Sequence, residues 1–157
     1  MRLKYEPSAV AVLPRLPPHN FPRHLHFIMQ SIATESAPPP AGHYEQARVH
    51  NGVVYVSGQL PVDPIDANRC VGSIEEQTRQ ALSNVEAILQ AAGSDLDHVL
   101  KTTVYIADIA LWDRVNDVYA AAFGEHRPAR AVVPTRELHH GFQVEIEAIA
   151  VLAGEAS

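Results

Sequence analysis

The sequence predicts an α+β domain in which two helices cover one face of a mixed sheet. A turn signal at Asn51-Gly52 lies between two short strand-like runs, as expected for a β-hairpin. Two later segments repeat apolar residues at helical spacing, and each ends at a glycine, Gly93 or Gly124. Strand-like runs precede, separate and follow these helices, which gives the element order β-β-α-β-α-β-β.

Each element has its own local signal. Ser73 and Glu76 match a capping box, in which the serine hydroxyl and the glutamate carboxylate satisfy free N–H groups in the first turn of a helix. The helix that begins there carries an apolar stripe typical of one buried face. A strand, a second amphipathic helix and two more strands follow it. The expected elements are strands at 47–50 and 53–56, a helix at 74–92, a strand at 99–107, a helix at 110–123, and strands at 129–136 and 142–152.

The two helices leave one face of the sheet uncovered. Right-handed crossovers place both helices on the same side, and successive side chains of the last strand alternate between the two faces. Glu145, Glu147, Ile149 and Val151 share the face away from the helices, where aliphatic residues would form an exposed apolar patch. We therefore expect the chain to self-associate through this face as a closed ring or dimer, with its site between subunits.

The acidic part of the last strand is the first candidate site. Glu145 and Glu147 precede aliphatic residues that favour burial, and a buried carboxylate is costly unless it is paired or hydrogen-bonded. Arg130, in the preceding strand-like run, is the candidate partner of Glu145 on a neighbouring element. The pair is interpreted either as a small polar site or as a structural ion pair, and Glu147 as a structural member of the same network.

Composition and charge exclude several classes of function. A chain of 157 residues predicts one domain, which we place at 29–157; residues 1–28 are expected to be a disordered extension, an artefact of an upstream start or of expression. Residues 29–157 carry a net charge of −9, so nucleic-acid binding is not expected. No apolar run reaches the ~20 residues that span a membrane. The single cysteine, Cys70, fits a reducing compartment, and we expect a cytoplasmic protein.

Several short motifs occur in order over about Ile32 to Val151. They are Gly42-His-Tyr-Glu-Gln-Ala47, Val56-Ser-Gly-Gln-Leu-Pro61, Glu76-Gln-Thr-Arg-Gln80, Lys101-Thr-Thr-Val104, Val115-Asn-Asp-Val-Tyr119, Pro128-Ala-Arg130 and Glu145-Ile-Glu-Ala-Ile-Ala150. In this order and spacing the motifs resemble the Rid (YjgF-type) family of reactive intermediate deaminases. The resemblance implies a chorismate-mutase-like fold and a homotrimer whose sheets line a central barrel, with clefts between subunits.

The resemblance also implies an activity. Rid proteins hydrolyse enamine and imine intermediates, such as 2-aminoacrylate, to 2-keto acids and ammonia, and they need no metal or cofactor. None of the nine histidines has zinc-site spacing with cysteine or acidic partners, so the sequence itself predicts no metal. We expect a 2-iminobutanoate/2-iminopropanoate deaminase-like hydrolase. The alternatives are a deaminase for a larger enamine such as 2-aminomuconate, and a non-catalytic, regulatory trimer that binds 2-keto acids.

The resemblance assigns roles to individual residues. Arg130 matches the family arginine that binds the substrate carboxylate, and its planar fork suits that task. Glu145 matches the acidic residue that directs the attacking water. The other expected cleft residues are Tyr44, Ser57, Gly58, Asn116 and Val132. Three of them have an alternative interpretation: Tyr44 as an aromatic lid, Gly58 as a bulge glycine, and Asn116 as a solvated helix asparagine.

The chain also departs from the family pattern. His43 stands where many members have proline, and Val132 occupies a position that is often cysteine. The loop at 137–142 differs from the proline-bearing loop that is common in the family. These departures leave substrate size and preference open.

Overall fold

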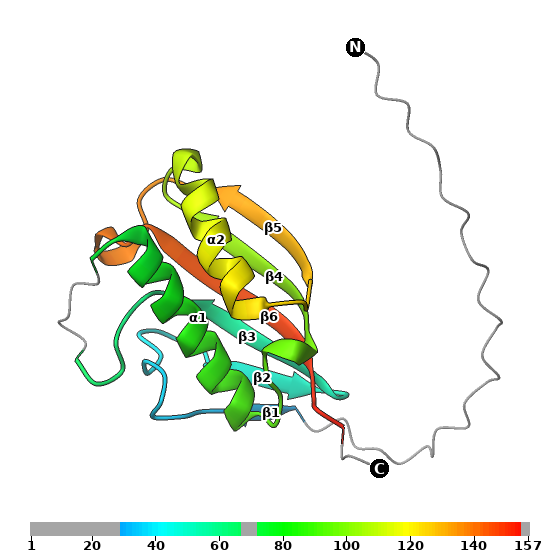
Figure 1. Cartoon of the computed structure of the whole chain (residues 1–157). Helices are drawn as coiled ribbons and strands as arrows, with labels where there is room; N and C mark the ends of the chain where they lie inside the picture. The colour runs from blue at the N-terminus through cyan, green and yellow to red at the C-terminus, as the bar shows by residue number, and fades with distance from the viewer. Residues whose placement is uncertain (1–28, 67–71, 155–157) are drawn as a thin grey trace, which may run out of the picture.

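The computed structural model describes residues 29–66 and 72–154 (Figure 1). The expected extension at 1–28 and the cysteine Cys70 lie outside the described residues. The elements in chain order are β1 (Gln30–Ile32), β2 (Ala47–His50), β3 (Val53–Gln59), α1 (Ile74–Ala91), the 3-10 turn η1 (Leu96–His98), β4 (Val99–Ile106), the 3-10 turn η2 (Ile109–Leu111), α2 (Trp112–Phe123), β5 (Ala129–Pro134), the 3-10 turn η3 (His139–Gly141) and β6 (Val144–Val151).

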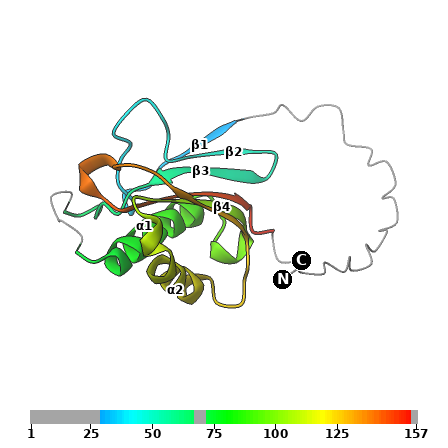
Figure 2. The same ribbon diagram turned by 90° about the horizontal axis from the view of Figure 1, so that it is seen from above.

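The strands form one mixed sheet in the order β1-β2-β3-β6-β4-β5. β4 and β5 run parallel, whereas the other neighbouring strands are antiparallel. Both α-helices pack on the same face of this sheet (Figure 2). The predicted α+β layout, with two helices on one face of a mixed sheet, is confirmed. The structure adds β1, which is too short to show an alternating pattern and which pairs with β2.

The helix boundaries follow the local signals in the sequence. The Ser73 hydroxyl accepts a hydrogen bond from the backbone N–H of Glu76 (3.4 Å), whose carboxylate accepts one from the N–H of Ser73 (2.7 Å). Gly93 follows the C-cap of α1 with a φ of 81°, a conformation that favours glycine. α2 begins later than predicted because η2 precedes it, with an N–H of η2 bonded to Asp108.

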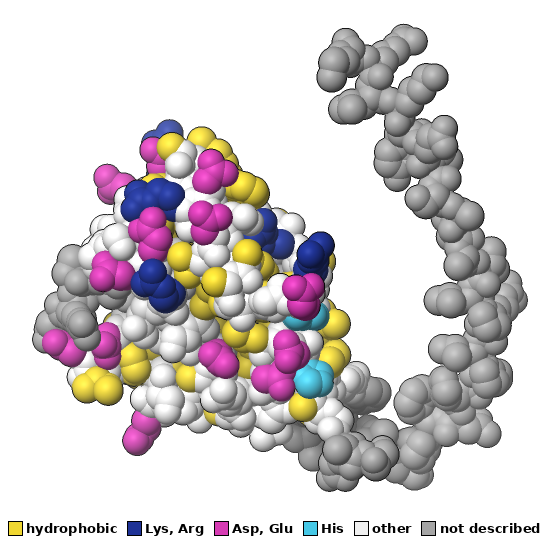
Figure 3. Space-filling view, viewed as in Figure 1, with side chains coloured by type: hydrophobic (Ala, Val, Ile, Leu, Met, Phe, Trp, Pro, Cys, Tyr) yellow, Lys and Arg dark blue, Asp and Glu magenta, His cyan; other side chains and the backbone are white. Residues whose placement is uncertain are grey.

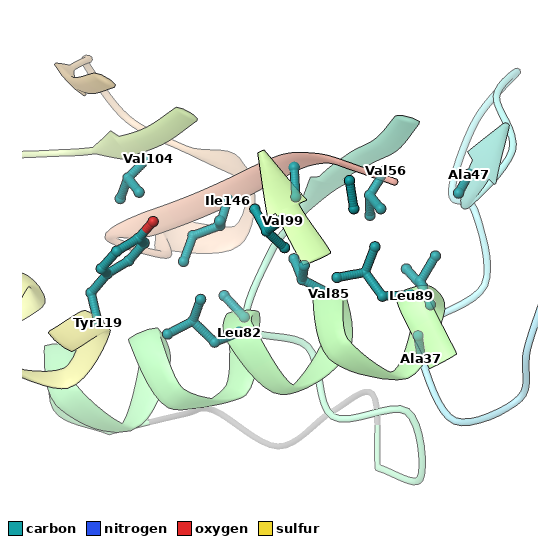
Figure 4. Close-up of a cluster of buried hydrophobic side chains, with 14 of the residues drawn as sticks. Ala37, Ala47, Val56, Leu82, Val85, Leu89, Val99, Val104, Tyr119 and Ile146 are labelled. Carbon is teal, nitrogen blue, oxygen red and sulfur yellow. The ribbon is translucent and has the colours of Figure 1, made fainter. Parts of the chain in front are cut away.

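The core lies between the sheet and the helices. Val54, Val104 and Ile146 come from three strands and belong to one buried cluster with Val85 and Ile88 of α1. Figure 4 shows these layers facing each other, with side chains from the sheet pointing toward those of the helices. Each such aliphatic side chain contributes roughly 1.5–3 kcal/mol on burial. This packing fixes the strands whose ends and edges carry the polar residues described below.

Neither α-helix covers the opposite face of the sheet (Figure 2). Tyr55, Ile149 and Lys101 lie next to one another across β3, β6 and β4. Tyr55 remains 48% exposed and Ile149 is half-buried. We call the face of the sheet that carries Tyr55, Ile149 and Lys101 the open face. Its aromatic and aliphatic side chains suit contact with another protein surface.

Over the helical face, carboxylates are interspersed with Lys and Arg (Figure 3). Arg114 of α2 donates two hydrogen bonds to the carboxylate of Glu75 in α1, at 2.6 and 2.8 Å. These bonds from Arg114 are the main cause of the low pKa of Glu75, about 2. Among the described residues, no helix has the length and apolar character needed to cross a bilayer.

Candidate functional site

Glu145 lies on the open face of β6, directly over the backbone of Gly58 in β3. A Cβ atom at position 58 would overlap Oε1 of Glu145 and would lie 3.0 Å from its Cδ. The pairing of β3 with β6 shifts register between Val56 and Gln59, so Gly58 lies at a β-bulge. Glycine at the bulge therefore makes the space that the Glu145 carboxylate occupies.

The Glu145 carboxylate lines a hollow of about 1090 Å³ at the end of the sheet. Tyr44 and Pro38, from the segment between β1 and β2, line one part of the hollow, and Phe142, just before β6, lines another. The Tyr44 hydroxyl accepts a hydrogen bond from the backbone N–H of Ala41 (3.2 Å), which folds the tyrosine back over its own loop. The hollow is thus largely apolar where Pro38, Tyr44 and Phe142 line it and acidic where Glu145 lies.

Ser57 connects the end of β3 to the loop before β2. Its hydroxyl donates a hydrogen bond to the backbone carbonyl of Glu45 (2.7 Å), and its backbone N–H donates to the carbonyl of Gln46 (3.0 Å). Ser57 lines the same hollow as Glu145. These bonds hold the loop that carries Tyr44 against the strand that carries Gly58.

The Glu145 carboxyl is easier to protonate than an ordinary glutamate. Burial raises the pKa of Glu145 above the usual 4.5; the positive charge of His139 lowers it in part, and the negative charge of Glu147 raises it. Tyr105 lies opposite Glu145 across β4 and β6. The pKa of Tyr105 is raised mainly by burial and, to a smaller extent, by the negative charge of Glu147. A carboxyl group whose pKa is raised in this way is suited to accept a proton from water.

Arg130 lies in a second polar cluster, on the helical face of β5. Its Nη2 donates a hydrogen bond to Oδ1 of Asn116 (3.0 Å) in α2. Its guanidinium carbon lies 4.6 Å from the ring centroid of Tyr119 and 5.8 Å from that of Trp112. The Tyr119 hydroxyl is in turn hydrogen-bonded to Thr102 of β4 (2.7 Å). The guanidinium is therefore held between an amide oxygen and two aromatic rings.

Sequence reasoning placed Arg130 and Asn116 in the site but missed Trp112, Tyr119 and Thr102. Trp112, Asn116 and Tyr119 are spaced by four and three residues, so they share one side of α2. That spacing is a signal that could have predicted the cluster. Val132, two residues after Arg130, points to the same face and packs beside the buried core.

The prediction that Arg130 is the partner of Glu145 on a neighbouring element of the same chain is wrong. β4 lies between β6 and β5, so the two residues are on non-adjacent strands. They also lie on opposite faces, because Arg130 is in register with the buried Thr102 whereas Glu145 is in register with Tyr105 of the open face. The structure brings Tyr44, Ser57, Gly58 and Glu145 together, and it brings Arg130, Asn116 and Val132 together elsewhere.

The two clusters have complementary chemistry. A guanidinium binds a carboxylate through two parallel hydrogen bonds, and a half-buried carboxyl can direct and deprotonate water. Within the described part of the chain, no group of three or more His, Cys, Asp or Glu side chains is placed to hold a metal ion. Together the clusters suit the addition of water to a small molecule that carries a carboxylate.

Comparisons with known proteins agree on one family. Residues 34–152 match the family model described as Endoribonuclease L-PSP. The chain is 44% identical over 124 residues to the 2-iminobutanoate/2-iminopropanoate deaminase of Bos taurus, covering 79% of this chain and 90% of that protein. It is 45% identical over 119 residues to a RutC family protein of Pyrococcus horikoshii, covering 76% of this chain and 94% of that one.

Solved structures give the same assignment. The YjgF gene product of E. coli superimposes with a TM-score of 0.74 at 40% identity, covering 78% of this chain and 98% of that chain. A putative endoribonuclease of Thermotoga maritima has a TM-score of 0.77 at 42% identity, covering 81% of this chain and all of the other. The chain belongs to the Rid (YjgF-type) family, as its motifs indicated.

Proposed function

We propose that this protein hydrolyses reactive enamine and imine intermediates of the 2-aminoacrylate type to 2-keto acids and ammonia. The observation that carries the proposal is the Glu145 carboxyl, packed over Gly58 in a hollow that raises its pKa. Relatives named 2-iminobutanoate/2-iminopropanoate deaminase, from Bos taurus at 44% identity and Homo sapiens at 40%, support the reaction class. A cytoplasmic location stays a prediction from the single cysteine.

The proposed active site is shared between chains of a homotrimer. One chain cannot supply both clusters to one substrate, because Arg130 and Glu145 lie on opposite faces of the sheet and on non-adjacent strands. β5 is one of the two edge strands of the sheet, so the Arg130 cluster lies at the side of the subunit, where a neighbour can reach it. We propose that head-to-tail contacts of this kind close into a ring of three chains, with the open faces turned inward as a central barrel.

In the proposed mechanism, Arg130 of one chain binds the α-carboxylate of the imine. Asn116 and Tyr119 hold the guanidinium in place before the substrate arrives, so little orientational freedom is lost on binding. Two parallel N–H···O bonds also set the plane of the carboxylate, and with it the direction of the imine carbon. Arg130 thereby presents that carbon to the Glu145 hollow of the next chain.

Glu145 then acts as the base for the water molecule that attacks the imine. Its carboxylate accepts a proton from a water molecule while the water oxygen forms a bond to the carbon of the protonated imine. The π electrons of the C=N bond move to nitrogen at the same time, which gives a carbinolamine. Glu145 returns that proton to the amine nitrogen, and a lone pair of the hydroxyl oxygen then forms the C=O bond as the C–N bond breaks with its electron pair going to nitrogen. Ammonia leaves, and the hydroxyl proton passes to solvent, which gives the keto acid. General-base assistance of this kind contributes about 10²–10⁴-fold to a rate.

The reaction can be tested directly on the purified protein. An amino-acid oxidase acting on alanine releases 2-iminopropanoate, which also hydrolyses slowly without a catalyst. We expect the protein to accelerate the appearance of ammonia and pyruvate in proportion to its concentration. No acceleration over the uncatalysed rate, at protein concentrations that match the oxidase, would contradict the proposal.

The rate of imine hydrolysis should fall at low pH, as Glu145 becomes protonated. Burial favours the neutral acid, so Glu145 becomes protonated at a higher pH than an ordinary glutamate, and the base is lost as pH falls. We expect kcat/KM, corrected for uncatalysed hydrolysis, to decrease on the acid side with a midpoint above the usual 4.5. A profile that stays flat down to about pH 4 would show that Glu145 is not the base.

Replacement of Gly58 by alanine should displace the Glu145 carboxylate. The added Cβ would overlap Oε1, so the side chain must move away from its place over β3. We expect kcat/KM to fall about 10²-fold, the loss typical of a misplaced catalytic group. Gly154→Ala is the matched control, because nothing lies within 4 Å of a Cβ there; equal losses in the two variants would contradict the assigned role of Gly58.

A non-catalytic trimer that binds 2-keto acids is the second candidate. A relative from Lactococcus lactis, 41% identical over 122 residues and covering 78% of this chain and 97% of that protein, is named putative regulator AldR. Such a protein would bind pyruvate in calorimetry but would leave the rate of imine loss unchanged. A deaminase for a larger enamine, such as 2-aminomuconate, would instead hydrolyse the long substrate faster than 2-iminopropanoate.

The family description as an endoribonuclease is the least suited to this chain. Residues 29–157 carry a net charge of −9, and strong RNA binding requires Lys and Arg to neutralise phosphates. On the helical face these residues are interspersed with carboxylates (Figure 3). We therefore do not include ribonuclease activity in the proposal.

A further inference from the structure

The η3 turn places two imidazoles at the rim of the Glu145 hollow. His139 and His140 both line the hollow, with ring centroids 6.0 Å apart. His140 adopts a φ of 60° and Gly141 a φ of 73°, so two successive left-handed residues reverse the chain just before β6. The His140 ring meets Phe142 edge to face at 6.2 Å. The turn and the ring contacts therefore hold the two histidines, which are exposed where they line the hollow.

Among the side chains that line the hollow, the imidazoles of His139 and His140 are the groups that can carry a positive charge. Among the residues that line it, Glu145 is the one carboxylate, and neither Lys nor Arg is present. Within the described residues, no hydrogen bond or ion pair occupies the ring nitrogens of His139 or His140, and both side chains are exposed. These N–H donors are available to an acidic group of a ligand.

The hollow is larger than the substrate of the proposed reaction needs. In a single chain its volume of about 1090 Å³ lies slightly above the range of about 300–1,000 Å³ that holds ligands of drug size, whereas 2-iminopropanoate has three carbon atoms. A substrate with a longer side chain can thus extend from Glu145 toward the rim. His139 offsets part of the negative charge of Glu145, which would otherwise repel a second acidic group near the rim.

We propose that His140, assisted by His139, selects imines whose side chain ends in a second carboxylate, such as the imines of aspartate and glutamate. This inference rests on the proposed function, since it assigns the substrate class of the same site. The α-carboxylate binds to Arg130, the reacting carbon lies at Glu145, and the distal carboxylate accepts hydrogen bonds from the imidazoles at the rim. His140 is then a specificity-determining residue and takes no part in the bond-making steps.

Two substitutions at position 140 remove the imidazole while the left-handed backbone conformation of the turn is kept. Asparagine and glycine both tolerate the left-handed conformation, so His140→Asn and His140→Gly keep the turn. His140→Asn keeps a hydrogen-bond donor without the possibility of charge, and His140→Gly removes both. His43→Ala is the matched control, because His43 is an exposed histidine of the neighbouring loop that does not line the hollow.

Three imines released by amino-acid oxidases distinguish charge from size. They are the imine of alanine, the imine of leucine as a long apolar side chain, and the imine of glutamate. We expect the wild-type protein to prefer the glutamate imine to the leucine imine. In His140→Gly the kcat/KM for the glutamate imine should fall about tenfold or more, the loss of a hydrogen bond to a charged group, with His140→Asn intermediate. The values for the alanine and leucine imines should change less than threefold, and His43→Ala should resemble the wild type.

The outcomes also separate this inference from the proposed function. A glutamate-to-leucine ratio that is unchanged in His140→Gly would overturn the role of His140 while leaving imine hydrolysis intact. If no imine is hydrolysed, calorimetry with the 2-keto acids decides: tighter binding of 2-oxoglutarate than of 4-methyl-2-oxopentanoate, lost in His140→Gly, supports the selectivity without catalysis. Equal binding of both keto acids, in a protein that hydrolyses no imine, would overturn the inference as well.

Discussion

Replacing Arg130 with lysine is expected to lower kcat/KM for 2-iminopropanoate by about 10²–10³-fold, even though the positive charge is kept. The guanidinium is held by the Asn116 side-chain oxygen and lies over the Tyr119 ring, an arrangement built for a planar group. Lysine offers a point charge with no fixed fork, so the plane of the bound carboxylate would no longer be set. Most of the loss should appear as a higher KM together with a lower kcat.

The matched control for this substitution is Arg127→Lys. Arg127 is an exposed arginine three residues earlier in the chain, so the same chemical change is made outside the proposed site. Ammonia release is measured for both variants under identical conditions. Comparable activity of Arg130→Lys and Arg127→Lys would show that Arg130 does not bind the substrate.

Ile149→Asp is expected to dissociate the assembly and to abolish activity at the same time. Ile149 lies in the middle of the open face, between Tyr55 of β3 and Lys101 of β4. If that face is buried between chains, an aspartate there places a charge in an apolar contact, which is strongly destabilising. Light scattering should show a fall from about three times the chain mass of 17.2 kDa toward the mass of one chain.

Ile65→Asp is the matched control, because it makes the same replacement of isoleucine by aspartate outside the open face. The Ile65 side chain is 96% exposed, so the same substitution introduces a charge that remains in water. This variant should keep the mass and the activity of the wild type. An Ile149→Asp variant that remains assembled and active would contradict the burial of the open face.

Local signals in the sequence predicted the helices well. The Ser73 and Glu76 side chains form the predicted capping box within one turn, and neither depends on the rest of the chain. β1 could not be predicted in this way, because its strand character comes from pairing with β2 across an intervening loop. The later start of α2 reflects a short 3-10 turn that shares the apolar spacing of the helix.

The candidate site was predicted residue by residue but not as an arrangement. The motifs indicated Tyr44, Gly58, Arg130 and Glu145, yet the order of the strands depends on pairing between distant segments, and β6 inserts between β3 and β4. That insertion separates Arg130 from Glu145. The overlap of a Cβ at Gly58 with the Glu145 carboxylate likewise depends on a register shift that no local pattern reveals.

The central claim, that each site combines Arg130 of one chain with Glu145 of the next, can be tested by mixing two inactive variants. Arg130→Ala and Glu145→Gln chains, carrying different affinity tags, are co-expressed, and trimers that contain both are isolated on the two tags in succession. In a closed ring of three, every such mixed trimer has one site with both residues intact, whichever variant is present twice. We predict about one third of the wild-type activity per trimer. Activity no greater than that of the two variants assayed separately would contradict the shared site.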